Sequence, residues 1–106
     1  MTTRITKYEV TPRDWTEEDY HTGITSIFTL TVESRGLGKW AVIRAGQCLR
    51  HDGRRWAYES MPSSRTERFK KAYRMSEEEA LALAEKHVKK ITFHGKTFEE
   101  VEEQWR

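Results

Sequence analysis

The chain reads KWAVIR at residues 39–44 and, after a loop, RRWAYES at residues 54–60. Both runs are rich in aromatic and β-branched residues, which favour strands. The pair Asp52-Gly53 lies between them, and glycine tolerates the positive φ that a tight turn requires. This stretch therefore predicts a β-hairpin around which the rest of the chain folds.

Two tryptophans give this hairpin its core. Trp40 lies in the first run and Trp56 in the second. Aromatic pairs across strands stabilise a small sheet. We therefore expect both tryptophans to be mostly buried on one face of the sheet, together with Phe28 or Leu30.

The rest of the sheet follows from similar patterns. Residues 24–34 alternate with a period of two and predict a long strand. The first run of the hairpin is expected to continue over residues 39–49, with a bend or bulge at Gly46, since glycine inside a strand often marks one. With residues 54–60 these strands form an antiparallel meander. Residues 4–10 are expected to add a short edge strand.

Two predicted helices begin with the sequence pattern of a capping box. Ser76 and Glu79 stand three residues apart, and such a pair satisfies two free N–H groups at the start of a helix. Acids fill the first turn and lysines the last, which matches the helix dipole and predicts a helix over residues 76–90. Thr97 and Glu100 repeat the spacing and predict a final helix. Its apolar face is expected to carry Phe98, Val101 and Trp105.

Weaker signals fill the gaps between these elements. Ser64 is expected to cap a short helix over residues 65–73, and residues 91–94 to form a fourth strand. Residues 11–14 predict a helical turn that leads into a loop over residues 15–23. The order β-β-β-α-β-α predicts an α+β fold, with a three- to four-stranded antiparallel sheet and helices packed on one face.

Length and composition limit the class of protein. A chain of 106 residues is expected to form one domain, of which residues 1–23 are partly irregular. Cys48 is the one cysteine, so no intrachain disulfide can form. Residues 1–10 hold no apolar run like that of a signal peptide, and no stretch approaches the length of a membrane span. The protein is therefore expected to be cytoplasmic, with no membrane partner.

The sequence contains none of the common catalytic motifs. The chain has no phosphate loop, dinucleotide fingerprint or nucleophile elbow. The run Cys48-x-x-His51-Asp52 holds ligand-type side chains, but one thiol is too few for a structural metal site. His87 lies on the apolar face of a predicted helix, where a packed, hydrogen-bonded histidine is commoner than a ligand. We therefore expect no enzyme activity, no metal and no cofactor.

Charge is unevenly distributed along the chain. Residues 35–74 hold eleven basic residues and three acids, a net charge of +8, whereas the remaining residues sum to −6. Clustered cations suit phosphate groups. The same pattern also suits a solvated face, or attraction between the two oppositely charged parts of the fold. The candidate nucleic-acid-binding residues are Arg50, Arg54, Arg55, Arg65, Arg68, Lys70, Lys71 and Arg74.

Three landmarks stand in the middle of the chain: GKWAVIR at 38–44, RW at 55–56, and SEEEALA at 76–82 with Gly95 beyond it. Together they resemble the plant ethylene-response-factor type of DNA-binding domain over about residues 36–97. The resemblance implies three antiparallel strands packed on one helix, with a sheet that reads the DNA major groove. The chain departs from that pattern at residues 61–75, which separate the third strand from the helix.

A second set of short runs covers most of the chain: GKWAV at 38–42, WAYE at 56–59, PSSR at 62–65 and EEALALA at 78–84. These runs are similar to small uncharacterised proteins of actinobacteria and their phages. That resemblance implies a source, such as a phage-encoded accessory protein, and no particular activity.

Two functions are compatible with these observations. The first is a small, non-enzymatic binding module that holds nucleic acid through the basic segment 35–74. The alternative is a protein-interaction module that binds and modulates a host or partner protein through exposed aromatics such as Trp15 and Tyr20. The continuity of the basic surface separates them, because cations interspersed with the acids of the helices disfavour nucleic acid.

Overall fold

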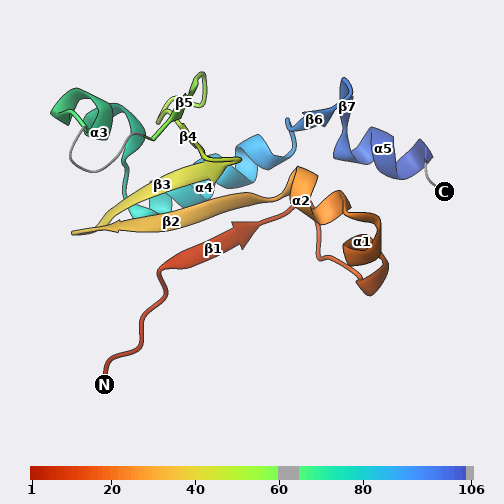
Figure 1. The fold of residues 1–106 in the computed structure, drawn as a ribbon, viewed down its shortest axis with the longest axis horizontal. Helices are drawn as coiled ribbons and strands as arrows, with labels where there is room; N and C mark the ends of the chain where they lie inside the picture. Colours follow the sequence, from red (N-terminus) through yellow and green to blue (C-terminus); the bar gives the residue numbers. More distant parts are fainter. Residues whose placement is uncertain (60–64, 105–106) are drawn as a thin grey trace.

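The computed structural model describes residues 1–59 and 65–104 and shows an α+β fold. A five-stranded antiparallel sheet runs in the order of the chain, and a separate two-stranded hairpin precedes the last helix (Figure 1). The predicted meander is present, with five strands in place of three or four. The strands are β1 Lys7–Val10, β2 Leu30–Gly36, β3 Lys39–Arg44, β4 Gln47–Leu49, β5 Trp56–Tyr58, β6 Thr92–Phe93 and β7 Lys96–Thr97. The helices are α1 Glu17–Thr22, α2 Ile24–Phe28, α3 Glu67–Tyr73, α4 Glu77–Val88 and α5 Phe98–Gln104.

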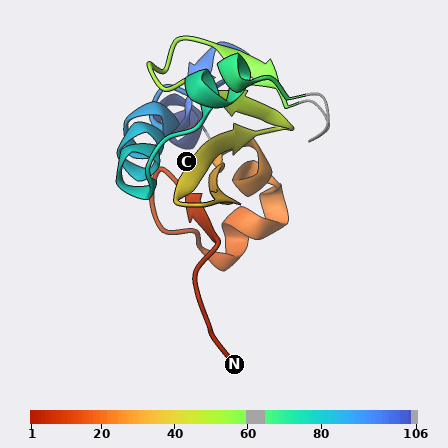
Figure 2. The ribbon, with the colours of Figure 1, turned by 90° about the vertical axis from the view of Figure 1, so that its left-hand side faces the viewer.

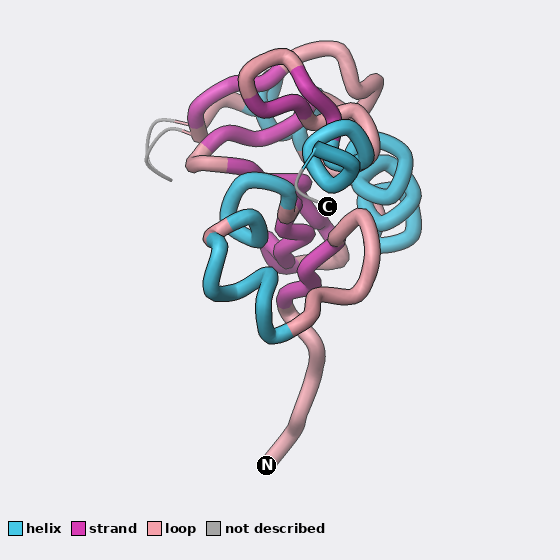
Figure 3. The backbone as a smooth tube through the Cα atoms, turned by 90° about the vertical axis from the view of Figure 1, so that its right-hand side faces the viewer, coloured by secondary structure: helices cyan, strands magenta, loops and turns pink. Residues whose placement is uncertain are grey.

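Different helices cover the two faces of the sheet. Trp40 of β3 packs in the main core with Ala80 and Ala84 of α4. The next residue, Ala41, packs in a second core cluster with Tyr73 of α3. Neighbouring residues of a strand point to opposite faces, and Figure 3 shows helices on both sides of the strands. The predicted packing of helices on one face is therefore wrong, because both faces of β3 are apolar and need cover.

The predicted turn at Asp52 and Gly53 is present and joins β4 to β5. The chain also reverses earlier, at Ala45 and Gly46, whose φ values of 50° and 79° suit a two-residue hairpin turn. The strand predicted over residues 39–49 is therefore two strands, β3 and β4. Gly46 alone suggested a bulge in one strand. A two-residue turn was not expected there, because it requires a positive φ at Ala45, which is unusual for alanine. The prediction that residues 39–44 and 54–60 pair as one hairpin is wrong, because β4 lies between β3 and β5 in the sheet.

The long strand predicted over residues 24–34 is also two elements. Its first half is the helix α2, and only the second half is the strand β2. Ile24 and Phe28 are four residues apart, so a helix buries both of them as a strand would, and alternation could not separate the two structures. Gly23, at φ 77°, ends α1 and begins α2.

The segment before α2, predicted as a loop, contains the helix α1. The side chain of Thr16 accepts the N–H of Asp19, and the Asp19 carboxylate accepts the N–H of Thr16 at 2.7 Å. The helical turn predicted at residues 11–14 is wrong, because these residues form a bend and the first helix begins only at Glu17. Arg13 then joins Asp19 to Glu102 of α5 through ion pairs of 2.6 and 3.0 Å. The hydrogen bond from Arg13 holds the pKa of Asp19 well below its usual range.

Both predicted capping boxes begin helices. The Ser76 hydroxyl accepts the N–H of Glu79 at 3.1 Å at the start of α4. Thr97 and Glu100 exchange backbone-to-side-chain hydrogen bonds of 3.1 and 3.5 Å at the start of α5. Phe98 and Val101 are buried as expected, and Trp105 lies outside the described residues.

Two weaker predictions have different outcomes. The helix predicted over residues 65–73 forms as α3, and Thr66 caps it by accepting the N–H of Phe69. The predicted cap, Ser64, lies outside the described residues. Residues 91–94, predicted as a fourth strand of the sheet, instead contribute β6 to the separate hairpin with β7.

Trp40 lies in the main core with Phe28 and Leu30, as predicted, whereas Trp56 only packs against that core. The prediction that both tryptophans belong to the buried core is therefore wrong for Trp56. Trp40 is 5% exposed. Trp56 is half-buried and packs edge-on against His87, with ring centroids 5.6 Å apart. The difference follows from position, since β5 is an edge strand of the sheet and β3 is central.

The two ends of the chain lie apart. Residues 1–5 are exposed and project away from the sheet (Figure 2), whereas the Thr6 carbonyl accepts the N–H of Ser34 of β2 at 2.8 Å. The helix α5 packs beside α1 and α2 at the other end of the molecule (Figure 1). The longest described helix, α4, has 12 residues. None of the described helices is long and apolar enough to cross a membrane.

Candidate anion-binding pocket

Three arginines converge on the carboxylate of Glu59, which directly follows β5. The Nε and Nη2 atoms of Arg35 each lie 3.0 Å from a different oxygen of Glu59. Arg65 Nη2 lies 3.3 Å from Glu59 Oε1, and Arg74 donates to Oε2. The four side chains are between 6% and 20% exposed. This arginine cluster therefore holds three positive charges around the shielded carboxylate of Glu59, and Arg35 also pairs with Glu33 at 2.9 Å.

A β-bulge places the first of these arginines. Ser34 pairs with Trp40 and Gly36 pairs with Lys39, so Arg35 is an extra residue on β2. A bulge of this kind redirects a side chain without ending the strand. The guanidinium of Arg35 consequently reaches across the sheet to the carboxylate beyond β5.

The backbone after α3 places Arg74. Its N–H donates to the carbonyl of Lys70 at 2.9 Å. The next residue, Met75, pairs with Trp40 of β3 through two backbone hydrogen bonds of 2.7 and 3.0 Å. The guanidinium also lies 5.5 Å from the ring centroid of Phe69. Arg74 is therefore fixed between α3 and the sheet, and Glu59 meets a preorganised donor.

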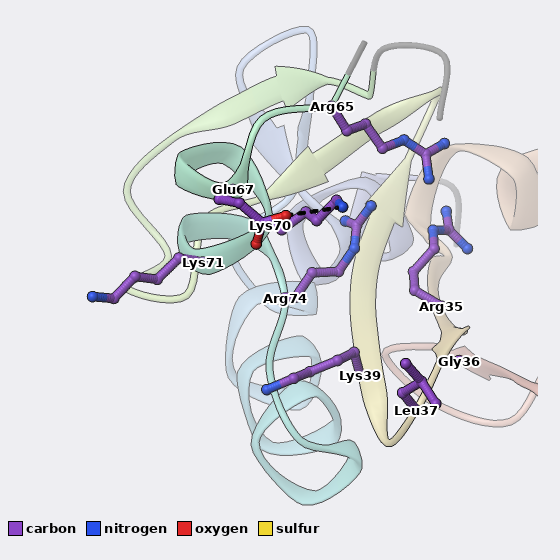
Figure 4. A pocket seen from close by; sticks show the side chains of 9 residues that line it. All are labelled: Arg35, Gly36, Leu37, Lys39, Arg65, Glu67, Lys70, Lys71 and Arg74. Carbon is purple, nitrogen blue, oxygen red and sulfur yellow. Dashed lines mark hydrogen bonds and ion pairs between the residues drawn. The ribbon is translucent and has the colours of Figure 1, made fainter. Parts of the chain in front are cut away.

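The arginine cluster borders a pocket of about 630 Å³ between α3 and the turn from β2 to β3. Figure 4 shows the guanidinium groups of Arg35, Arg65 and Arg74 turned toward one another, with the Lys70 amine beside them. A pocket of this volume is typical of small-molecule sites. Its lining residues are Arg35, Gly36, Leu37, Lys39, Arg65, Glu67, Lys70, Lys71 and Arg74.

The pocket stays positive at neutral pH. Burial by itself raises the pKa of Glu59, but the hydrogen bonds and charges of Arg35 and Arg74 outweigh burial, so the pKa falls below its ordinary value. Glu59 is therefore ionised at neutral pH. Six cations line the pocket, against the carboxylates of Glu59, Glu33 and Glu67. The surplus of three charges attracts anions, and guanidinium groups bind phosphate oxygens in pairs.

The structure brings four of the predicted nucleic-acid-binding residues together. Lys70 and Lys71 lie on α3, with Arg65 before the helix and Arg74 after it. Arg68 is exposed on the same helix, outside the pocket lining. The C-terminal half of the basic segment thus forms one surface around the pocket.

The other three predicted residues lie in the loop between β4 and β5. His51 of this loop donates its N–H to the carbonyl of Ala72 at 3.0 Å, and it lines a second hollow together with Lys71. Glu79, from the first turn of α4, borders that hollow. Arg54 and Arg55 are exposed, and Arg50 lies 3.7 Å from the carboxylate of Asp52.

Sequence reasoning missed three residues of the site: Arg35, Lys39 and Glu59. Arg35 and Lys39 count toward the positive charge of residues 35–74, but they are not among the predicted binding residues. The turn between β2 and β3 brings both of them beside α3. No local pattern relates them to α3, because the contact depends on the strand order of the sheet.

The remaining chemical candidates, Cys48 and His87, lie in buried or half-buried positions. Cys48 is buried, with its Sγ 3.7 Å from Glu59, and burial followed by the charge of Glu59 raises the pKa of the thiol. His87 is half-buried, and burial, Lys90 and Arg44 lower its pKa. Across the described residues, no three His, Cys, Asp or Glu side chains are placed to hold a metal ion.

Trp15 and Tyr20 border a separate hollow of about 450 Å³, which is otherwise lined by eight non-aromatic residues. Tyr20 is 64% exposed. Trp15 is half-buried, since its ring packs edge-on against Phe98 at 5.6 Å and its indole N–H donates to Thr29 at 3.4 Å. Trp15 therefore anchors the N-terminal segment, and Tyr20 is the more available of the two for a partner.

No protein-family model, curated protein or solved structure matches this chain. The pocket itself therefore provides the starting point for function.

Proposed function

We propose that this protein is a small, non-enzymatic binding module that holds nucleic acid by its phosphates. The observation that carries the proposal is the gathering of six cations around one pocket, of which Lys39, Lys70 and Lys71 are exposed. Surplus cations of this kind neutralise phosphates and release the counterions condensed on them. Lys71 lines both the pocket and the neighbouring hollow, which it shares with His51 of the loop between β4 and β5 and with Glu79 of α4.

The distribution of charge supports this use of the surface. Arg68, Arg54 and Arg55 are exposed beside the pocket and the neighbouring hollow. Long, mobile cationic side chains contact a phosphate backbone without reading its sequence. Affinity without strong sequence preference is therefore expected.

Fluorescence anisotropy with labelled single-stranded and duplex oligonucleotides tests the proposal. Each titration is repeated from low to physiological salt. The logarithm of the association constant is expected to fall linearly with the logarithm of the salt concentration, since each neutralised phosphate releases counterions. A parent protein that binds neither DNA nor RNA at low salt, where attraction is greatest, contradicts the proposal.

A second candidate function is a protein-interaction module. The observation that favours it is the exposed ring of Tyr20 at the hollow that it shares with Trp15. Tyrosine is enriched at protein interfaces because its ring is apolar and its hydroxyl forms hydrogen bonds. The two functions use different surfaces, so Tyr20→Ala is expected to leave nucleic acid binding unchanged.

A further inference from the structure

We infer that the pocket between α3 and the turn from β2 to β3 binds a phosphate monoester, namely the terminal phosphate of a nucleic acid strand. This inference rests on the proposed function and names the chemical group that enters the pocket. The exposed cations of α3 and of the loop at residues 50–55 contact the phosphodiesters that follow the strand end.

The arrangement of the arginines favours a single phosphate group over the successive phosphodiesters of a nucleic acid backbone. The guanidinium groups of Arg35, Arg65 and Arg74 turn toward one another around the Glu59 carboxylate, and three lysines share the lining of the same pocket (Figure 4). A strand backbone presents single charges spaced along its length, which suit a line of separated cations. A phosphate monoester concentrates a charge of about −1.5 to −2 and three acceptor oxygens in one group. Convergent donors match that concentrated group.

The charge of the pocket also fits a monoester. Its six cations face the carboxylates of Glu59, Glu33 and Glu67, which leaves a surplus of three positive charges. Glu59 holds the guanidinium planes in place, because Arg35 donates to it through two nitrogen atoms. The Lys70 ammonium lies beside these arginines and 3.3 Å from the Glu67 carboxylate (Figure 4). A dianion therefore meets a site that is already oriented and nearly matched in charge.

The arginine cluster is recessed, and this favours the end of a nucleic acid strand over its interior. Arg74 is 6% exposed and Arg35 17% exposed. A backbone that passes along the surface cannot bring an internal phosphate to such recessed groups, whereas a terminal phosphate projects from its strand. The pocket volume of about 630 Å³ is sufficient for a nucleotide-sized end group.

A matched set of oligonucleotides tests this inference with the full chain. The set has one sequence with a 5′-phosphate, a 3′-phosphate or hydroxyl ends. A hydroxyl-ended oligonucleotide two nucleotides longer serves as the charge control. We expect one of the phosphorylated ends to bind about tenfold tighter than the charge control, since charge-assisted hydrogen bonds of this strength form only at the end.

Three outcomes separate the inference from the proposed function. A preference for either phosphorylated end supports both. Equal binding of all four oligonucleotides overturns the inference and leaves the proposed function standing. No binding of any oligonucleotide at low salt overturns both.

Two variants in α3 test whether the preference for a phosphorylated end arises in the pocket. Lys70→Ala removes an exposed ammonium beside the arginine cluster, and Arg68→Ala removes an exposed guanidinium outside the pocket. Lys70→Ala is expected to remove most of the preference for the phosphorylated end. Arg68→Ala is expected to weaken binding to phosphorylated and hydroxyl ends alike, which leaves their ratio unchanged. A ratio that Lys70→Ala does not alter overturns the inference.

Discussion

Arg35 and Glu59 are 24 residues apart in the sequence, yet they share two hydrogen bonds of 3.0 Å. Arg35 lies on β2 and Glu59 directly follows β5, with β3 and β4 between those strands. The pair spans the sheet beside α3 and orients the cluster that forms the pocket. The same interaction therefore contributes to stability and to the candidate binding site.

The first prediction concerns the pH dependence of this pair. Arg35 and Arg74 outweigh burial and lower the pKa of Glu59 in the folded protein, whereas glutamate in an unfolded chain titrates near a pKa of about 4.3. A lowered pKa stabilises the fold above the unfolded value, and this contribution is lost as pH falls through the folded value. Glu59→Gln is expected to lower the free energy of unfolding by about 2 kcal/mol at pH 7.

Urea denaturation at several pH values measures this effect. The difference in unfolding free energy between parent and Glu59→Gln is expected to shrink as pH falls below about 4, because the parent carboxylate then becomes protonated. Other acids titrate in the same range, but they are common to both proteins and cancel in the difference. A difference that stays constant from pH 7 to pH 3 contradicts the assigned ion pairs.

The second prediction compares Trp40 and Trp56. Trp40 is 5% exposed on a central strand, whereas Trp56 is half-buried on an edge strand. Trp40→Ala is expected to lower the free energy of unfolding by about 3–5 kcal/mol, the usual effect of deleting a buried aromatic side chain. Trp56→Ala is expected to have a smaller effect. Chemical denaturation measures both, and a larger loss for Trp56→Ala contradicts the description of the core.

The third prediction concerns the start of α4. Ser76→Ala removes the side-chain cap from the N–H of Glu79 and is expected to destabilise the protein by about 1 kcal/mol. Ser76→Asp is the control, because aspartate caps helices as well as serine does. Thermal melts compare the three proteins. An unchanged midpoint in Ser76→Ala would show that the hydroxyl does not stabilise the helix.

The helix starts and the turn that depend on residues close together in the sequence were predicted correctly. Ser76 with Glu79, and Thr97 with Glu100, begin helices because a cap and its partner lie within one turn. Asp52 and Gly53 form a turn for the same reason. Residues 24–28 were harder to predict, because the spacing of Ile24 and Phe28 suits both a helix and a strand.

The candidate site was predictable only in part. The basic segment identified Arg65, Lys70, Lys71 and Arg74, since these side chains lie on or beside one short helix. The convergence on Glu59 could not be predicted, because it depends on strand order, on the bulge in β2 and on a helix on each face of the sheet. Those features arise from tertiary packing and leave no short-range pattern.

The most direct test of the proposed function compares two triple variants across a salt series. The pocket variant carries Lys39→Ala, Lys70→Ala and Lys71→Ala, which remove three exposed ammonium groups from the pocket lining. The control variant carries Lys86→Ala, Lys89→Ala and Lys90→Ala, which remove three exposed ammonium groups at the end of α4. Both variants change the net charge equally, and both are expected to keep the melting temperature of the parent.

The pocket variant is expected to flatten the salt dependence of oligonucleotide affinity by about two to three units of slope, because three phosphate contacts are lost. The control variant is expected to keep a slope close to that of the parent. A parent protein that does not bind at low salt, or two variants that flatten the slope equally, would contradict the assignment of the basic pocket as the nucleic acid site.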